Sequence, residues 1–233
     1  MTALLAATGN AAAQTVDEIV AKAIQAKGGD KWKAVQSTRM TARITLQGME
    51  LPMTIVSRRP NLMRQDITVP MQNITIVQGF DGEKGWALNP MAGAEATELP
   101  AAATESMKDQ ADFDGPLVDY KAKGNTVELV GTEDVAGAKA HHLKVTKKNG
   151  KVQHLYIDAA RGVELKTVSE VDMGEGMTRV ETELSDYRTV DGILVPFSMR
   201  VNGGPAGPVS MTVDKVEFNV TVDDKMFKIP GKL

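Results

Sequence analysis

The chain has 233 residues, of which 42% are hydrophobic and 24% are charged, as is ordinary for a globular protein. Its 27 basic and 30 acidic residues give a formal net charge of −3, and no basic stripe with interleaved aromatic residues supports nucleic-acid binding. No apolar run reaches the ~20 residues that cross a bilayer, and the absence of Cys excludes disulfides, thiolate metal sites and a Cys nucleophile.

Residues 1–13 form a short apolar stretch that ends in Ala11-Ala12-Ala13, directly before Gln14. Small residues in this place are typical of the cleavage end of a secretory signal peptide. The stretch is short and has no positively charged start. We therefore interpret 1–13 as the remnant of a signal peptide or as a disordered N-terminus, and we leave it out of the fold.

The first predicted helix begins at a capping box, in which Thr15 supplies the hydroxyl and Glu18 the carboxylate three residues later. The apolar residues that follow share one helical face: Val16, Ile19, Val20, Ala23 and Ile24. Gly28-Gly29 should end this helix, and a short turn over Asp30–Val35 should follow, with Trp32 packed inward. The apolar stripe of such a helix must be buried on a neighbouring element, for which the next segments supply a sheet.

The hydrophobic period changes to two residues from Thr38 onward, which predicts a half-buried strand. Its apolar members alternate with polar residues: Met40, Ala42, Ile44 and Leu46. Gly48 should turn the chain, and Met53–Arg58 should return beside it as an antiparallel strand. Further strands are predicted in this part of the chain: Met63–Val69, Asn73–Phe80 and Trp86–Leu88.

A short helix is predicted over Ala101–Ala111, directly after Pro100, because the segment is rich in Ala, Glu, Met, Lys and Gln. The following segment, Phe113–Gly124, should be irregular, with a turn at Gly115-Pro116. A second series of strands should then fill the chain: Thr126–Thr132, Ala140–Lys147, Lys151–Asp158, Val163–Val171, Met177–Tyr187, Val195–Val201 and Pro208–Val220.

Asn149-Gly150 is a two-residue hairpin signal between two of these strands. Such a turn fixes a register with the following opposite pairs: Lys148 with Lys151, Val145 with His154, and Leu143 with Tyr156. His141 and His142 are neighbours in a strand, so their side chains should point to opposite faces. Because this register places His154 opposite Val145 and not opposite either of them, it argues against a metal site made of the three histidines.

The turn signals, the single helical interruption and the lack of a repeat or linker predict one α+β domain over residues 14–233. We expect a single large curved antiparallel sheet, closed by the N-terminal helix and by short lid helices. A sheet with this many strands tends to curl. The expected architecture is therefore a half-open β-barrel.

The sequence contains no convincing constellation for catalysis or metal binding. It has no Gly-x-Ser-x-Gly elbow, no Gly-rich phosphate loop and no dinucleotide fingerprint. Asp112-Phe113-Asp114-Gly115 resembles the start of a calcium loop, but the later ligands are missing and ordinary turn chemistry explains it equally well. We therefore expect no catalytic residue, no metal and no cofactor, and interpret the protein as not an enzyme.

Two short signatures separate strands in the first half of the chain: Arg58-Arg59-Pro60-Asn61, and Asp81-Gly82-Glu83-Lys84-Gly85-Trp86 followed by Asn89-Pro90. Pro60 lacks an N–H and biases Arg59 toward an extended backbone, which is typical of a strand end. Arg59 is then either part of a charged turn or aimed at a neighbouring carbonyl or lid segment. Trp86 is either a core residue or a ligand contact.

Together these signatures resemble the core pattern of the periplasmic outer-membrane lipoprotein carrier (LolA-like) superfamily. The segment Asp223–Pro230 is similar to the closing Phe-x-x-Pro strand of that family, so the resemblance covers roughly the N-terminal half and the C-terminus. It implies a half-open barrel with a helical lid around an apolar cavity for acyl chains. It also implies that Arg59 corresponds to the arginine that controls the lid. This chain is longer than typical carriers, and Met and Leu replace several aromatics.

The resemblance implies a soluble periplasmic carrier that binds acyl chains of lipids or lipoproteins for transfer to the outer membrane. The alternative is a periplasmic sensor or accessory module of the same fold that binds a protein partner. Expected partners are therefore acyl chains and inner- and outer-membrane proteins, with no nucleic acid and no stable membrane insertion. The expected ligand-binding residues of the cavity and lid are Met40, Ile44, Leu46, Met53, Ile55, Arg59 and Trp86.

Methionine is abundant in this chain, with 13 residues, whereas aromatic residues make up only 4%. Met side chains are flexible and polarizable, so they fill irregular apolar space. A Met-rich core and a deformable apolar cavity both explain this composition.

Overall fold

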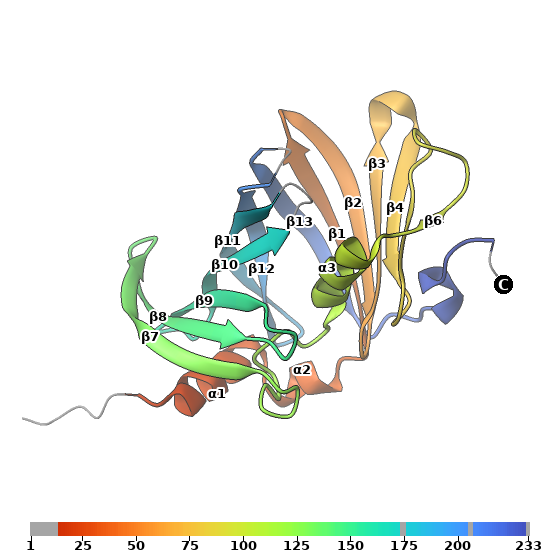
Figure 1. Ribbon diagram of the computed structural model, residues 1–233. Helices are drawn as coiled ribbons and strands as arrows, with labels where there is room; N and C mark the ends of the chain where they lie inside the picture. The colour runs from red at the N-terminus through yellow and green to blue at the C-terminus, as the bar shows by residue number, and fades with distance from the viewer. Residues whose placement is uncertain (1–13, 173–175, 205–206, 232–233) are drawn as a thin grey trace, which may run out of the picture.

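The architecture is an open sheet that curls around a short helix, as the computed structural model in Figure 1 shows. The structure describes residues 14–172, 176–204 and 207–231. The expected signal-peptide remnant, residues 1–13, lies outside the described residues. None of the described helices is long and apolar enough to span a membrane.

Among the described residues, a single antiparallel sheet of thirteen strands forms the body of the protein. The strands of its first half are β1 (Ser37–Leu46), β2 (Met49–Arg58), β3 (Leu62–Val69), β4 (Ile74–Phe80), β5 (Gly85–Leu88) and β6 (Thr97–Glu98). The strands of its second half are β7 (Thr126–Val135), β8 (Ala138–Thr146), β9 (Val152–Asp158), β10 (Glu164–Asp172), β11 (Met177–Val190), β12 (Ile193–Asn202) and β13 (Val209–Phe218).

The order of the strands shows that the sheet does not close into a complete barrel. They follow one another as β6-β5-β4-β3-β2-β1-β13-β12-β11-β10-β9-β8-β7, so the pairing of β1 with β13 joins the two halves. The two edge strands, β6 and β7, lie at opposite ends of this order and do not pair with each other. The predicted half-open, curved antiparallel sheet is therefore confirmed.

In the described part of the chain, three α-helices accompany the sheet: α1 (Val16–Lys27), α2 (Asp30–Ala34) and α3 (Ala101–Ala111). The predicted capping box is present, because Thr15 Oγ1 accepts from the backbone N–H of Glu18 while the Glu18 side chain accepts from that of Thr15. In Figure 1, α1 and α2 lie across one end of the sheet, whereas α3 lies inside its curve. Two short 3₁₀-helices complete the described elements: η1 (Pro70–Gln72) and η2 (Asp224–Phe227).

Three clusters of buried side chains connect the helices to the sheet. The α1 cluster contains Ile19, Val20, Leu117, Leu143, Val145, Leu155 and Ile157. The α2 cluster contains Trp32, Val35, Ala42, Phe113, Ile193, Val195, Phe197, Val213 and Val216. The α3 cluster contains Met63, Phe80, Met107 and Ala111. Most buried side chains are aliphatic, and burial of this apolar surface is the main force that holds the helices on the sheet.

The predicted register of the β8–β9 hairpin is wrong by one residue. Lys147 N–H donates to Lys151 O at 2.8 Å, and Gly150 N–H donates to Lys147 O at 2.8 Å. The loop therefore comprises residues 148–150, with Gly150 in the left-handed region at φ 83°. This is the geometry of a hairpin with an extra residue at a glycine bulge. In the resulting register, Leu143 lies opposite Leu155 and Lys144 lies opposite His154.

The corrected register leaves His154 opposite neither of the other histidines, as predicted, but it puts the side chains of His142 and His154 in contact. His142 Nε2 lies 2.7 Å from His154 Nδ1, and His142 Nδ1 lies 2.7 Å from a carboxylate oxygen of Glu133. His141 is not part of this group, and both of its ring nitrogens are buried without a hydrogen-bond partner. No group of three or more potential metal ligands exists among the described residues.

The C-terminal segment also differs from the expected closing strand. Asp223 accepts a hydrogen bond from Lys225 N–H through its side chain at 2.9 Å and so begins η2 instead of a strand. This short helix covers part of the sheet with Phe227, which is fully buried.

Candidate functional site

The five apolar residues predicted to form a binding face do share one face of the sheet. In the β1–β2 register, Met40 lies opposite Ile55 and Ile44 lies opposite Leu51, while Met53 lies opposite Ala42. Opposite residues of an antiparallel pair project from the same face, and so do alternate residues along each strand. Leu46 follows Ile44 on this face, and all five predicted residues are half-buried.

This face is the inner side of the curved sheet. Ile55 packs against the α3 cluster, in which Met107 of α3 contacts the sheet beside Phe80. Figure 1 shows α3 within the curve of the sheet, where it contacts β4 and β5. Met53 pairs with Ile67 of the next strand, and Ile44 pairs with Met211 on its other side. We call Met40, Ile44, Leu46, Met53 and Ile55 the inner face.

Arg59 connects the strand end to two other segments. Its Nε donates to Val35 O at 2.6 Å, its Nη2 donates to Trp32 O at 3.2 Å, and its Nη1 forms an ion pair with Asp114. The guanidinium also lies 4.6 Å from the centre of the Phe113 ring. Of the two alternatives for Arg59, the contacts correspond to the second, an arginine aimed at carbonyls and at the segment that follows α3.

The segment that follows α3, which contains Phe113 and Asp114, is attached to α2 by aromatic and polar contacts. The Trp32 and Phe113 rings stack with centroids 5.1 Å apart, and the indole N–H donates to Asp114 Oδ1 at 2.9 Å. Burial acts to raise the pKa of Asp114, but hydrogen bonds from Arg59 and Trp32 outweigh it and hold that pKa below its ordinary value. Asp114 therefore stays ionised and binds Arg59 over the neutral pH range.

Trp86 lies on the opposite face from the inner face. Gly85 pairs with Phe80, whose side chain packs against Met107 of α3. Because successive residues of a strand point to opposite faces, the next residue, Trp86, points away from α3. Its ring is 1% exposed, and its N–H donates to Phe227 O of η2 at 2.6 Å. Trp86 is therefore part of the core between β5 and the C-terminal segment, and the structure does not bring it together with the other predicted site residues.

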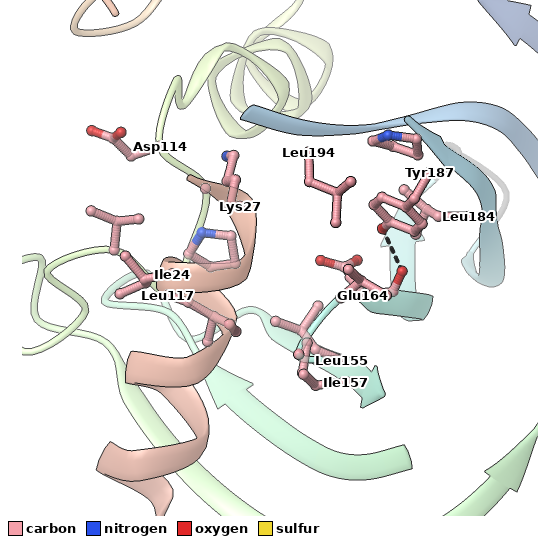
Figure 2. Close-up of a pocket in the computed structure, with 17 residues that line it drawn as sticks. Ile24, Lys27, Asp114, Leu117, Leu155, Ile157, Glu164, Leu184, Tyr187 and Leu194 are labelled. Carbon is pink, nitrogen blue, oxygen red and sulfur yellow. Dashed lines mark hydrogen bonds between the residues drawn. The ribbon is translucent and has the colours of Figure 1, made fainter. Parts of the chain in front are cut away.

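A cavity of about 250 Å³ lies at the α1 end of the molecule and was not predicted (Figure 2). Side chains from α1, the segment after α3, and β9–β12 surround it. Its apolar lining includes Ile24, Leu117, Val118, Leu155, Ile157, Val163, Leu184, Leu194 and Pro196. None of the seven predicted site residues lines this cavity. The only sequence signal for it was the apolar stripe of α1, which predicts burial but not a cavity.

Three polar side chains line the cavity together with Asp114. Burial lowers the pKa of Lys27 to about 8, against the opposing attraction of Asp114 and Glu164. Burial raises the pKa of Glu164, whose carboxylate accepts a hydrogen bond from the Thr167 hydroxyl. The Tyr187 hydroxyl donates to the backbone oxygen of Glu164, as Figure 2 shows, and burial raises its pKa. The cavity is therefore apolar with a few desolvated polar groups.

No family model matches the sequence, and no curated protein sequence matches it either. Many solved structures resemble the fold at low sequence identity, among them the following three. A DUF1329 family protein from Desulfovibrio piger has a TM-score of 0.64 and 16% identity, over 93% of this chain and 98% of that chain. A LolA superfamily protein from Nitrosomonas europaea also has a TM-score of 0.64, with 12% identity over 93% and 98% of the two chains.

The third structure is a domain from Vibrio parahaemolyticus described as an outer membrane lipoprotein-sorting protein. Its TM-score is 0.60, with 11% identity over 90% of this chain and 94% of that chain. Similarity at this level of identity concerns the fold, and it extends over nearly the whole of each chain. The protein therefore shares the half-open barrel fold of these three structures, one of which is a LolA superfamily protein.

Proposed function

We propose that the protein is a soluble periplasmic carrier that binds acyl chains of lipids or lipoproteins on its inner face and transfers them toward the outer membrane. The observation that carries this proposal is the inner face itself, a continuous set of half-buried apolar side chains inside the curve of an open barrel. The lipoprotein-sorting description of the Vibrio parahaemolyticus domain supports the same class of cargo.

The chemistry of the inner face suits acyl chains. Each methylene group that moves from water to an apolar surface contributes ~0.8 kcal/mol without any need for directional contacts. Met40 and Met53 can adapt their three rotatable bonds to chains of different shape. Such a surface would hold many lipids with similar affinity, which is what a carrier requires.

The contacts of Arg59 supply a means of retention. The segment after α3 is held to the end of β2 by the Arg59–Asp114 ion pair and to α2 by the stacked Trp32 and Phe113 rings. Since Met107 of α3 packs with Ile55 of the inner face, movement of this segment would uncover the Ile55 end of that face. We propose that α3 and its following segment form the lid, and that a partner membrane protein promotes its opening.

Replacing Ile44 with aspartate should weaken lipid uptake at least tenfold. A carboxylate on the inner face must either lose its hydration or keep water beside the acyl chain, and both disfavour binding. Thr45→Asp is the matched control, because Thr45 is exposed on the opposite face of the same strand. The measurement is native mass spectrometry of each protein, purified without detergent and incubated with a phospholipid extract.

The expected spectra show lipid adducts for the unmodified protein and for Thr45→Asp, and few for Ile44→Asp. Circular dichroism establishes that both variants are folded. Equal adduct levels in the two folded variants would contradict binding on the inner face. A clean apo mass for the unmodified protein would remove the carrier proposal and favour the alternative of a sensor that binds a protein partner.

A further inference from the structure

Lys27 brings to the α1 cavity a positive charge that no carboxylate pairs with directly. Its ammonium lies 3.7 Å from the centre of the Trp32 ring, and within the described parts of the chain it forms no ion pair or hydrogen bond. Figure 2 shows Lys27 on the α1 side of the cavity, with Leu194 and Leu184 farther along it. The cavity therefore has a cation at one side and apolar walls beyond it.

The acidic groups near Lys27 are already engaged. Asp114 pairs with Arg59, and Asp112 pairs with Lys123 at 2.7 Å. Glu164 accepts the hydrogen bond of the Thr167 hydroxyl, and burial favours its neutral form. Lys27 is thus in contact with the Trp32 ring but has no carboxylate at ion-pair distance, and a desolvated charge without an ionic partner is unfavourable.

We propose that this cavity binds a single-chain amphiphile with a carboxylate head group, such as a free fatty acid, whose carboxylate pairs with Lys27. The cavity volume of about 250 Å³ is slightly below the ~300–1,000 Å³ of pockets for drug-sized ligands, which leaves room for one short acyl chain. The apolar side chains would contact the chain, while the ammonium would set its orientation. This site is separate from the inner face, so the two proposals can fail independently.

The test compares decanoic acid with decan-1-ol, which has the same chain length but no charge. We expect isothermal titration calorimetry to give at least tenfold tighter binding of the acid at pH 7. The Lys27→Met variant should lose about tenfold in affinity for the acid and keep its affinity for the alcohol. Lys33→Met is the matched control for net charge, because Lys33 lies on the exposed surface of α2 with Asp30 3.5 Å away.

A spectroscopic measurement separates pairing with Lys27 from a general effect on the cavity. Decanoic acid labelled with ¹³C at its carboxyl carbon should show a lower carboxyl pKa when bound to the unmodified protein than when bound to Lys27→Met. Affinity for the acid should also fall as the pH rises above about 8, where free Lys27 loses its proton. Asp112, Asp114, Glu164 and Arg59 contribute to the potential at Lys27 and are present in every variant of the series.

Equal affinity for the acid and the alcohol would overturn the proposal, and so would an unchanged affinity of folded Lys27→Met for the acid. If Lys27→Met does not fold, the ratio of the affinities of the unmodified protein for the acid and for the alcohol still tests the proposal. Failure of both ligands to bind would also overturn it. That result would leave the inner-face proposal intact, because the Ile44→Asp comparison with long-chain phospholipids tests that face alone.

Discussion

Replacing Arg59 with leucine should lower the free energy of unfolding by about 3 kcal/mol and speed the loss of bound lipid, while the protein stays folded. Breaking a buried ion pair by removing one partner costs about 3–5 kcal/mol. The side chains of Arg59 and Asp114 are 19% and 22% exposed, which favours the lower end of that range. The Val35 carbonyl also loses its Arg59 donor, while the Trp32 carbonyl keeps the backbone N–H of Val35 as a donor.

The neighbouring arginine provides a control within the same motif. Arg58 forms an ion pair with Asp224 of η2, but these side chains are 39% and 53% exposed. Arg58→Leu should therefore cost less than about 1 kcal/mol and leave lipid retention unchanged. Urea denaturation measures the stability of both variants, and dissociation of a fluorescent lipid measures retention. Unaltered retention in folded Arg59→Leu would refute the role of Arg59 in holding the lid.

The effect of Arg59→Leu on stability should depend on pH in a defined direction. The pKa of Asp114 is lowered in the folded protein, so ionised Asp114 favours folding at a pH above the ordinary Asp pKa of ~3.9. This contribution is lost as the pH falls through the lowered folded-state pKa. The stability difference between the unmodified protein and Arg59→Leu should therefore persist at pH 5–7 and shrink in strong acid, as measured by urea denaturation at each pH.

Local sequence signals predicted most of the elements because the relevant interactions are local. The capping box at Thr15 and the strong helix formers of Ala101–Ala111 correspond to helices that begin and end as expected. The two-residue period of β1 correctly placed Met40 and Ile44 on one face. Strand alternation depends only on the backbone, so this set could be predicted before its neighbours were known.

Predictions that required a decision between similar local geometries were less successful. Asn149-Gly150 fits both a two-residue turn and the end of a longer loop with a glycine bulge, and the structure has the longer loop. One additional residue in the loop moves every pair along the hairpin. The contact between His142 and His154 was missed for this reason.

The cavity at α1 could not be predicted, because it depends on segments that are far apart in the sequence. Lys27 lies in the last turn of α1, where a cation is favourable at the negative end of the helix dipole, so the sequence offers a sufficient local explanation for it. Its separation from any ion-pairing partner emerges only when β10 and the segment after α3 are in place. Burial and pairing of charges are properties of the tertiary structure.

Replacing Trp86 with alanine should lower the free energy of unfolding by about 4–5 kcal/mol, the largest effect we expect for a single substitution. Truncating a buried Trp costs about 3–5 kcal/mol through lost burial and the cavity left behind. The Phe227 carbonyl also loses its donor. Strand alternation alone could not distinguish this role from a ligand contact, since β5 is covered on both faces, by α3 and by η2.

Gly79 provides a structural check on this interpretation of Trp86. A Cβ atom added at Gly79 would lie 2.4 Å from the Trp86 ring, so Gly79→Ala should destabilise the unmodified protein. In the Trp86→Ala background the ring is absent, and the same substitution should cost much less, which a double-mutant cycle by urea denaturation would reveal. If Trp86→Ala instead left stability within about 1 kcal/mol and abolished lipid uptake, Trp86 would be a ligand contact. Because the indole is 1% exposed and bonded to η2, we expect the loss of stability.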